Sequence, residues 1–239
     1  MPEETNSPVT RPDGERAFDA VVFDLDGVIL DTENVIHSVW AETFDRYGAS
    51  FSAKEWATIV GTDYGFDPYA AVVARSTVPV PSRAELGRQV LERQLELLRG
   101  LTPFPGVREW IDSAERLGMA LAVASSSPAP WVHARLEDVG LASHFSVVSC
   151  RSETLAAKPA PDLYLDACNR LGVEPTRAIA VEDSVNGLTA ALAAGLACLA
   201  VPNSITRDHD LKAANLTAES LAALPLEQAM RLLSRDRAN

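Results

Sequence analysis

The segment AVVFDLDGVILDT, residues 20–32, decides how this chain folds. Its first four residues form a short apolar run, which predicts a buried strand. The run ends in two aspartates, Asp24 and Asp26, and a glycine follows them. Two like charges at the end of a buried strand are unfavourable unless a cation compensates them. The magnesium ion is the obvious candidate because it prefers oxygen ligands, and a carboxylate beside Mg²⁺ at a strand end indicates phosphoryl chemistry.

Composition narrows the class of protein. The chain has 239 residues, of which 47% are hydrophobic and 23% are charged, and a globular protein of this size can bury a substantial core. Its formal net charge of -12 argues against binding to nucleic acids or to anionic membrane surfaces. No apolar segment approaches the ~20 residues that span a bilayer. Three widely spaced cysteines lie in or beside apolar stretches, which predicts buried free thiols at Cys150, Cys168 and Cys198.

The start of the chain predicts no ordered structure. Its first fifteen residues are polar, contain prolines and lack the apolar core of a signal peptide. We therefore expect a disordered segment at 1–17 and a cytoplasmic protein. We further expect a monomer or a weak homodimer.

Two hydrophobic patterns divide the rest of the chain. From Thr32 to about Gly100, apolar residues recur at helical spacing without a strand pattern. Within that stretch, Ser82 and Glu85 form a capping-box signature before a long helix. Beyond it, helices alternate with short apolar runs that predict buried strands at 119–124, 145–148, 178–181 and 196–201.

This alternation predicts an α/β fold. Its core is a Rossmann-like, mostly parallel sheet with helices on both faces, and an all-helical domain is inserted into it. The expected boundaries are 18–31 and 102–239 for the core and 32–101 for the insertion. In such sheets, ligands bind outside the carboxyl ends of the strands.

Several polar side chains are expected at that carboxyl edge. Asp24 and Asp26 follow the first strand, and Lys158 lies in a loop after the 145–148 strand. Two further strands end in the pairs Ser125-Ser126 and Glu182-Asp183. Together these residues supply a carboxylate nucleophile, further acids, a hydroxyl and a cation, which metal-assisted phosphoryl transfer requires.

Four short motifs in this order resemble the haloacid dehalogenase superfamily. The matching segments are DLDGVILDTE at 24–33, VASS at 123–126, Lys158-Pro159, and EDS at 182–184 with Gly187. The resemblance covers residues 18 to about 233. It is to the branch whose helical cap lies between the first and second motifs, which includes phosphoglycolate phosphatase and beta-phosphoglucomutase.

The resemblance implies a role for each acid. Asp24 would attack phosphorus and form an aspartyl-phosphate, while Asp26 would protonate the leaving oxygen and later deprotonate water. Asp26 also favours phosphoester cleavage over dehalogenation, because the dehalogenase branch lacks this second aspartate. The magnesium site would comprise Asp24, the Asp26 backbone carbonyl and Asp183, with Glu182 acting partly through water.

The remaining motif residues would bind the phosphoryl group. Ser125 would contribute its hydroxyl, Ser126 its backbone N–H, and Lys158 would neutralise charge shared with Asp24. Ser126 or Ser127 would also cap the helix that begins near Pro128.

The expected activity is magnesium-dependent hydrolysis of a small, sugar-phosphate-like metabolite. The cap would exclude water and select the substrate by closing over the core, with hinges near 31–32 and 101–105. A phosphosugar mutase of the beta-phosphoglucomutase type is the alternative, but the cap loop at 61–69 contains no arginine to grip a second phosphate. Two other classes fit less well. A non-catalytic relative would lack the motif residues, and a dinucleotide-binding enzyme would carry Gly-x-Gly-x-x-Gly after its first strand.

Overall fold

A computed structural model describes residues 17–52, 55–56 and 66–236 of the chain. Nearly all of the expected disordered segment at 1–17, and residues 61–65 of the cap loop at 61–69, lie outside the described residues. None of the helices in the described part is long and apolar enough to cross a membrane.

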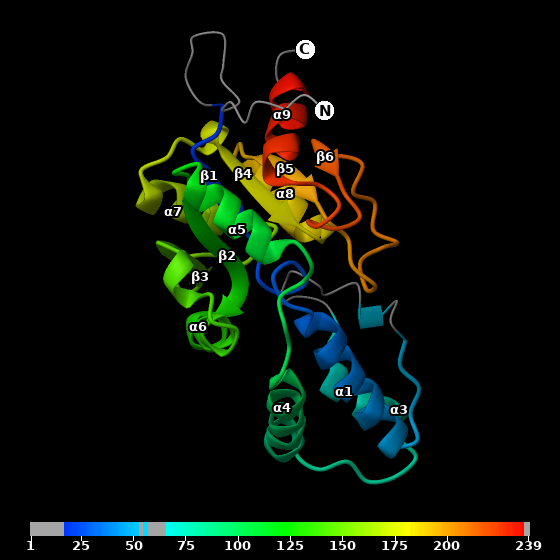
Figure 1. The fold of residues 1–239 in the computed structure, drawn as a ribbon. Helices are drawn as coiled ribbons and strands as arrows, with labels where there is room; N and C mark the ends of the chain where they lie inside the picture. Colours follow the sequence, from blue (N-terminus) through cyan, green and yellow to red (C-terminus); the bar gives the residue numbers. More distant parts are fainter. Residues whose placement is uncertain (1–16, 53–54, 57–65, 237–239) are drawn as a thin grey trace.

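The core is a six-stranded parallel sheet (Figure 1). The order β3-β2-β1-β4-β5-β6 places the first strand in the middle, so β1 pairs with β2 on one side and β4 on the other. This confirms the predicted Rossmann-like α/β fold. The strands are β1 Ala20–Phe23, β2 Ala120–Pro128, β3 Val147–Arg151, β4 Ala178–Glu182, β5 Ala197–Ala200 and β6 Leu216–Thr217.

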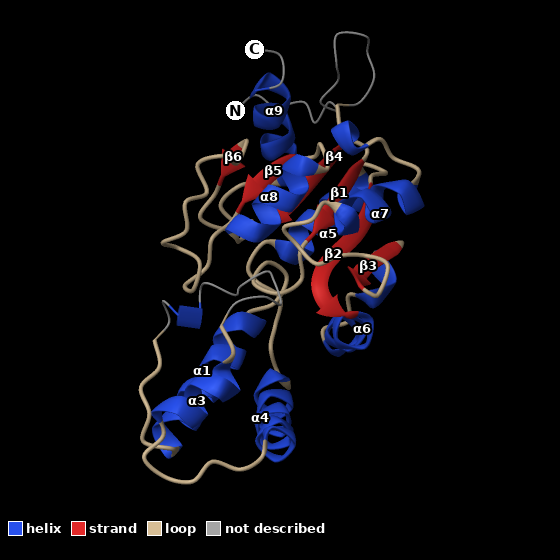
Figure 2. Ribbon diagram, turned by 180° about the vertical axis from the view of Figure 1, so that it is seen from behind, coloured by secondary structure: helices blue, strands red, loops and turns tan. Residues whose placement is uncertain are grey.

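Helices cover both faces of this sheet (Figure 2). Alternate residues of β1 point to opposite faces, so Val21 and Phe23 join one apolar cluster while Ala20 and Val22 join the other. The first cluster is completed by α5 Val107–Arg116, α6 Ala129–Asp138 and α9 Leu226–Asp236. The second is completed by α7 Asp162–Leu171 and α8 Val185–Ala193. Two short 3-10 helices, Ala142–His144 and Pro175–Arg177, precede β3 and β4.

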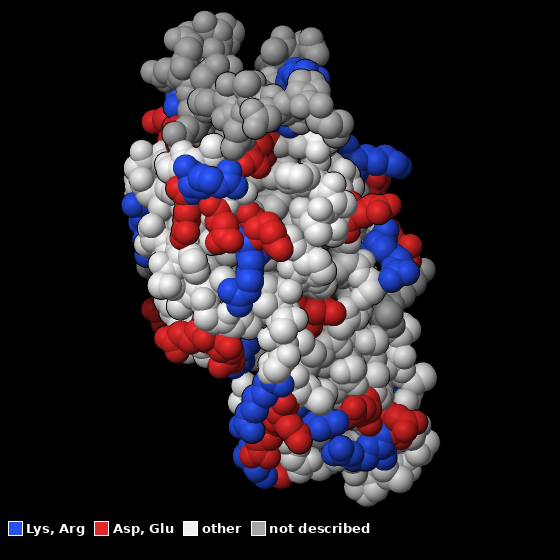
Figure 3. Space-filling model, in the orientation of Figure 1, with Lys and Arg blue, Asp and Glu red and all other residues white. Residues whose placement is uncertain are grey.

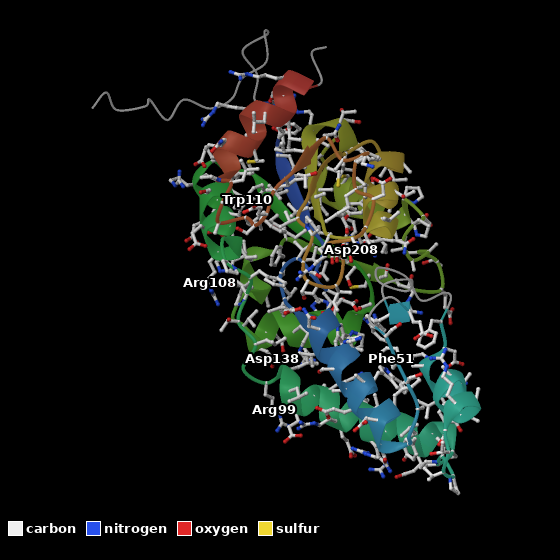
Figure 4. All side chains as sticks on the ribbon, turned by 90° about the vertical axis from the view of Figure 1, so that its right-hand side faces the viewer. Phe51, Arg99, Arg108, Trp110, Asp138 and Asp208 are labelled. Carbon is white, nitrogen blue, oxygen red and sulfur yellow. The ribbon has the colours of Figure 1, made fainter. Side chains whose placement is uncertain are left out.

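Trp110 ties α5 to the sheet and to the segment before α9 (Figure 4). Its ring packs edge-on against Phe23, with centroids 6.3 Å apart. Its indole Nε1 donates to the carbonyls of Leu221 and Leu224, at 3.2 and 2.8 Å. A large apolar ring is thus buried with its one polar atom satisfied.

Among the described residues, three long helices form a separate group beyond the carboxyl edge of the sheet (Figure 1). They are α1 Thr32–Arg46, α3 Pro68–Arg75 and α4 Arg83–Leu98, and we call them the helical unit. The unit has an apolar cluster of its own, which includes Val39, Phe44, Val72, Leu86 and Val90. Ser82 caps α4 by accepting from the Glu85 N–H, as the capping-box signature predicts.

One strand boundary and one helix cap differ from the prediction. β2 continues to Pro128, beyond the predicted end at residue 124, because Ser125 pairs with Cys150 and Pro128 with Arg151 across a register shift. The predicted capping of α6 by Ser126 or Ser127 is wrong. Pro128 occupies that position without a side-chain hydrogen bond, and the Ser127 hydroxyl donates to Asp26 instead. The three cysteines are free and buried, as predicted.

Candidate active site

The parallel sheet brings the predicted site residues to one edge. Asp24 follows β1, Ser125 lies within β2, and Glu182 ends β4 with Asp183 directly after it. Lys158 lies in the connection between β3 and α7. Each of these five residues is at most 5% exposed, which is rare for charged residues unless they are paired.

Lys158 links two of the carboxylates. Its Nζ donates to Asp24 Oδ1 and to Glu182 Oε1, both at 2.6 Å. Glu182 Oε1 also accepts from the Tyr164 hydroxyl at 2.5 Å, and Glu182 Oε2 accepts from the Asp183 N–H at 3.3 Å. Both oxygens of Glu182 are therefore held by protein donors, and Glu182 acts as the anchor of Lys158.

Asp183 has one satisfied oxygen and one unsatisfied oxygen. Its Oδ2 accepts from Asn203 Nδ2 at 2.7 Å and from the Thr206 hydroxyl at 3.4 Å. Its Oδ1 is buried without a hydrogen-bond partner among the described residues. A buried carboxylate oxygen without a donor is costly, which makes this atom a natural ligand for a cation.

Two glycines allow this close packing. Gly27 has φ +95°, and a Cβ there would collide with the Asp183 carboxylate and come within 2.8 Å of Asn203 Nδ2. Gly187 lies in the first turn of α8, where a Cβ would collide with the Glu182 carboxylate. The glycines of the first and fourth motifs therefore provide space for the acids beside them.

The acids repel one another in this buried setting. Burial raises the pKa of Asp24 well above its usual range, and this outweighs the opposite effect of Lys158. Burial, followed by the charges of Asp24 and Glu182, raises the pKa of Asp183 in the same way. Burial alone would lower the pKa of Lys158, but the two carboxylates raise it above its ordinary value. One lysine thus faces three carboxyl groups, so ionising all three would leave an excess of negative charge.

These residues fit a hard divalent cation. Asp24, Glu182 and Asp183 can place one ligand oxygen each within 4.8 Å of one another. The unsatisfied Asp183 Oδ1 and the excess negative charge both favour an ion with oxygen ligands. The hydrogen bonds to Glu182 leave it less available than the two aspartates.

Asp26 faces a different set of groups. Its Oδ1 accepts from the Thr32 hydroxyl at 2.7 Å and from Trp131 Nε1 at 3.1 Å. Its Oδ2 accepts from the hydroxyls of Ser125 at 3.2 Å and Ser127 at 2.7 Å. The Asp26 side chain is thus turned toward β2 and α6.

Ser126 supports the loop that carries Lys158. The Ser126 hydroxyl accepts from the Lys158 N–H at 3.1 Å, and its carbonyl accepts from Arg151 Nε at 2.9 Å. Ser126 therefore contacts the site through its side chain, a contact that the sequence analysis did not anticipate.

Sequence reasoning missed four further residues of the site: Tyr164, Asn203, Thr206 and Trp131. Asn203 and Thr206 follow β5 at the same sheet edge as the other strand-end residues, and that position was an available signal. Tyr164 and Trp131 lie on helices, where their spacing matches ordinary core residues. Nothing in the local pattern marks them as partners of Glu182 and Asp26.

A cavity of about 280 Å³ lies beside the site, where the helical unit joins the core. The two chain segments that connect the core to the helical unit both line this cavity. Val28 and Asp31 belong to the segment before α1, and Phe104 belongs to the segment after α4. Asn34 of α1 bridges this junction, since its Nδ2 donates to Ser204 Oγ at 2.6 Å and to Asp31 Oδ1 at 2.7 Å. The loop after β5, in which Asn203 and Thr206 donate to Asp183, therefore also contacts the helical unit. The remaining residues of the lining are Gly27, Asn34, Pro105, Val201, Pro202, Asn203, Ser204, Glu219, Ser220 and Leu221.

Sequence comparisons agree with this arrangement. Residues 21–201 match the family described as haloacid dehalogenase-like hydrolase. The chain is 35% identical over 210 residues to the Bacillus subtilis protein YhcW, covering 86% of this chain and 95% of YhcW. It is 30% identical to hexitol phosphatase B of Escherichia coli O157:H7, covering 86% of this chain and 93% of that protein.

A solved structure agrees as well. The crystal structure of CbbY from Rhodobacter sphaeroides, in complex with phosphate, superposes with a TM-score of 0.72. The two chains are 31% identical, and the match covers 87% of this chain and 96% of CbbY. The similarity therefore includes the helical unit as well as the sheet.

Proposed function

The chain belongs to the haloacid dehalogenase-like hydrolases and is a phosphatase, and we propose that it hydrolyses a small sugar-phosphate-like metabolite through an aspartyl-phosphate. The observation that carries this proposal is the buried cluster at the sheet edge. In it, Lys158 is bonded to Asp24, and Asp183 presents an unsatisfied oxygen. Such a cluster suits a charged nucleophile that meets a dianionic phosphoryl group.

The proposed reaction has two halves. In the first, an Asp24 oxygen bonds to phosphorus while the ester P–O bond breaks, and Asp26 gives a proton to the departing oxygen. In the second, water attacks phosphorus, its proton passes to Asp26, and the bond between Asp24 and phosphorus breaks. Inorganic phosphate is released and both acids return to their starting states.

The other residues prepare this reaction. Lys158 holds Asp24 in place and offsets negative charge on the phosphoryl oxygens. Ser125 and the Ser126 backbone N–H would bind those oxygens. Asp24, Asp183 and the Asp26 carbonyl would hold Mg²⁺, with Glu182 reaching it through water, and the ion would supply charge stabilisation at the phosphoryl group.

The relatives support the substrate class. One of them is a hexitol phosphatase, and the CbbY structure holds phosphate. We propose that the helical unit, residues 32–101, acts as a cap over the core residues 18–31 and 102–239. Closure would exclude water and limit substrates to small molecules. The predictions of a cytoplasmic protein and of a monomer or weak homodimer stay as predictions.

A phosphate-release screen over a panel of phosphorylated metabolites tests this proposal. We expect turnover of sugar or sugar-alcohol phosphates in the presence of Mg²⁺, its loss with EDTA, and its recovery when Mg²⁺ is added back. Turnover that persists in EDTA would overturn the metal role. The products should also be examined for isomerised sugar phosphates, because isomerisation without phosphate release would identify the mutase alternative.

A further inference from the structure

One of the four donors to Asp26 differs from the others in chemistry. Thr32, Ser125 and Ser127 each donate a hydroxyl, whereas Trp131 donates an indole N–H to Oδ1. A hydroxyl can reverse its role and accept a hydrogen bond, but an indole N–H can only donate. Oδ1 of Asp26 therefore faces a permanent donor, and Oδ2 does not.

Two of the three hydroxyl donors, Ser125 and Thr32, also have competing roles. In the proposed function, Ser125 turns toward the phosphoryl group when substrate binds, and its bond to Asp26 Oδ2 is then released. Thr32 begins α1, which belongs to the helical unit, so its position depends on where that unit lies. Trp131 belongs to the core and does not contact the phosphoryl group in the proposed reaction, so it can hold Asp26 throughout.

The Trp131 ring is itself fixed in place. Arg135, one turn later on α6, lies over the ring with its guanidinium carbon 5.1 Å from the centroid. Arg135 is only 8% exposed, and its Nε and Nη2 donate to Asp138 Oδ2 at 3.0 and 2.6 Å. Asp138 lies at the end of the same helix (Figure 4). The hydrogen bonds to Asp138 thus hold the Arg135 guanidinium against the Trp131 ring.

We propose that Trp131 is a positioning residue that presents Oδ2 of Asp26 to the leaving group. This inference rests on the acid–base role of Asp26 in the proposed function. The Asp26 proton moves from Oδ2 to the ester oxygen as the P–O bond breaks. It is replaced on Oδ2 by a proton from water as the aspartyl-phosphate is hydrolysed. The indole stays bonded to Oδ1 in both halves.

Leaving-group dependence tests this role. A poor leaving group needs a proton from Asp26, whereas p-nitrophenolate departs without one. We would measure kcat/KM of the Trp131→Phe variant on p-nitrophenyl phosphate, phenyl phosphate and ethyl phosphate, because kcat/KM reports the step in which the ester bond breaks. We expect a loss of roughly tenfold or more on ethyl phosphate and of less than about threefold on p-nitrophenyl phosphate.

Three further variants separate the outcomes. Trp40→Phe is the matched control, since Trp40 packs in the apolar cluster of the helical unit, and it should show no dependence on the leaving group. Arg135→Met should show a weaker form of the Trp131→Phe pattern, because it loosens the ring without removing the indole. Asp26→Asn should show the strongest pattern of all.

Two results would overturn the proposal in different ways. If Asp26→Asn depends on the leaving group but Trp131→Phe and Arg135→Met lose activity equally on all three esters, only the positioning role of Trp131 is wrong. If Asp26→Asn itself loses activity equally on all three esters, its acid–base role is wrong, and the inference is lost with it.

Discussion

The core and the helical unit treat charge in opposite ways. In the core, Lys158 and its carboxylate partners are almost completely buried, and each bond is short. In the helical unit, several ion pairs lie on the surface with both side chains at least 40% exposed. They include Arg83 with Asp67, Arg88 with Glu85, and Arg93 with Glu96. Figure 3 shows acidic and basic side chains interspersed over the helical unit.

Buried and exposed charges differ in what they contribute to the stability of the fold. Taking charges out of water costs several kcal/mol per ion, so a buried cluster of like charges is a poor way to stabilise a fold. We therefore attribute the cluster at the sheet edge to the proposed phosphoryl chemistry and not to stability. Exposed pairs contribute little either way, which leaves the surface charges of the helical unit free to vary. Four substitutions examine this contrast.

The largest effect is expected from Asp24→Asn. This change keeps the size of the side chain but removes the proposed nucleophile, so phosphate release from p-nitrophenyl phosphate should fall by roughly 10⁴-fold or more. Circular dichroism should show an unchanged fold. Retained turnover would mean that the buried cluster serves stability and that the contrast has been misread.

Lys158→Met comes next. It leaves Asp24 and Glu182 without their shared cation in a buried setting, so we expect a loss of about 3–5 kcal/mol in the free energy of unfolding. Chemical denaturation measures this loss. An unchanged denaturation midpoint would show that burying Asp24 and Glu182 does not require the charge of Lys158.

Glu33 is a buried acid of the helical unit, and it should make the stability of the protein depend on pH. It belongs to α1, yet burial and then the charge of Asp26 raise its pKa from 4.5 to about 7. Between these values the folded protein keeps a proton that the unfolded chain has released. Stability should therefore fall as pH rises from about 4.5 to 7, by at most about 3 kcal/mol. The unfolding temperature of Glu33→Gln should change less with pH across this range than that of the wild type. If the two plots of unfolding temperature against pH run parallel, the assignment to Glu33 is wrong.

The smallest effect is expected from Arg88→Ala, which serves as the surface counterpart of Lys158→Met. Arg88 pairs with Glu85 and Glu92 at 2.8 Å, but all three side chains are well exposed. Denaturation should show a change below about 1 kcal/mol. A change as large as that of Lys158→Met would remove the distinction between buried and exposed pairs.

Much of the fold could be predicted from local patterns. Apolar runs located the strands, and the rule that parallel strands carry sites at their carboxyl ends placed Asp24, Ser125 and Glu182 together before any contact was known. The extension of β2 could not be predicted in this way. It depends on how Ser125 and Pro128 align with β3, which is a long-range property.

The directions of side chains were harder still to predict. Trp131 has the spacing of a core residue on α6, and only the folded structure shows that its N–H reaches Asp26, 105 positions earlier in the chain. Ser126 or Ser127 was expected to cap α6, and Ser127 instead donates to the same carboxylate. In both cases a tertiary partner prevails over the local preference, and a single sequence carries no signal for such a partner.

The central position of β1 also has a consequence for how the protein is made. This strand is synthesised first, but its two neighbours in the sheet are residues 120–123 and 178–181. Contacts between such distant segments form slowly, because long loops must close before the pairing is gained. The helical unit, with its own apolar cluster, can fold while the chain is still being extended. The strand that precedes the proposed nucleophile therefore completes its pairing only after residues 178–181 have been made, and the proposed active site is assembled only with the late strands.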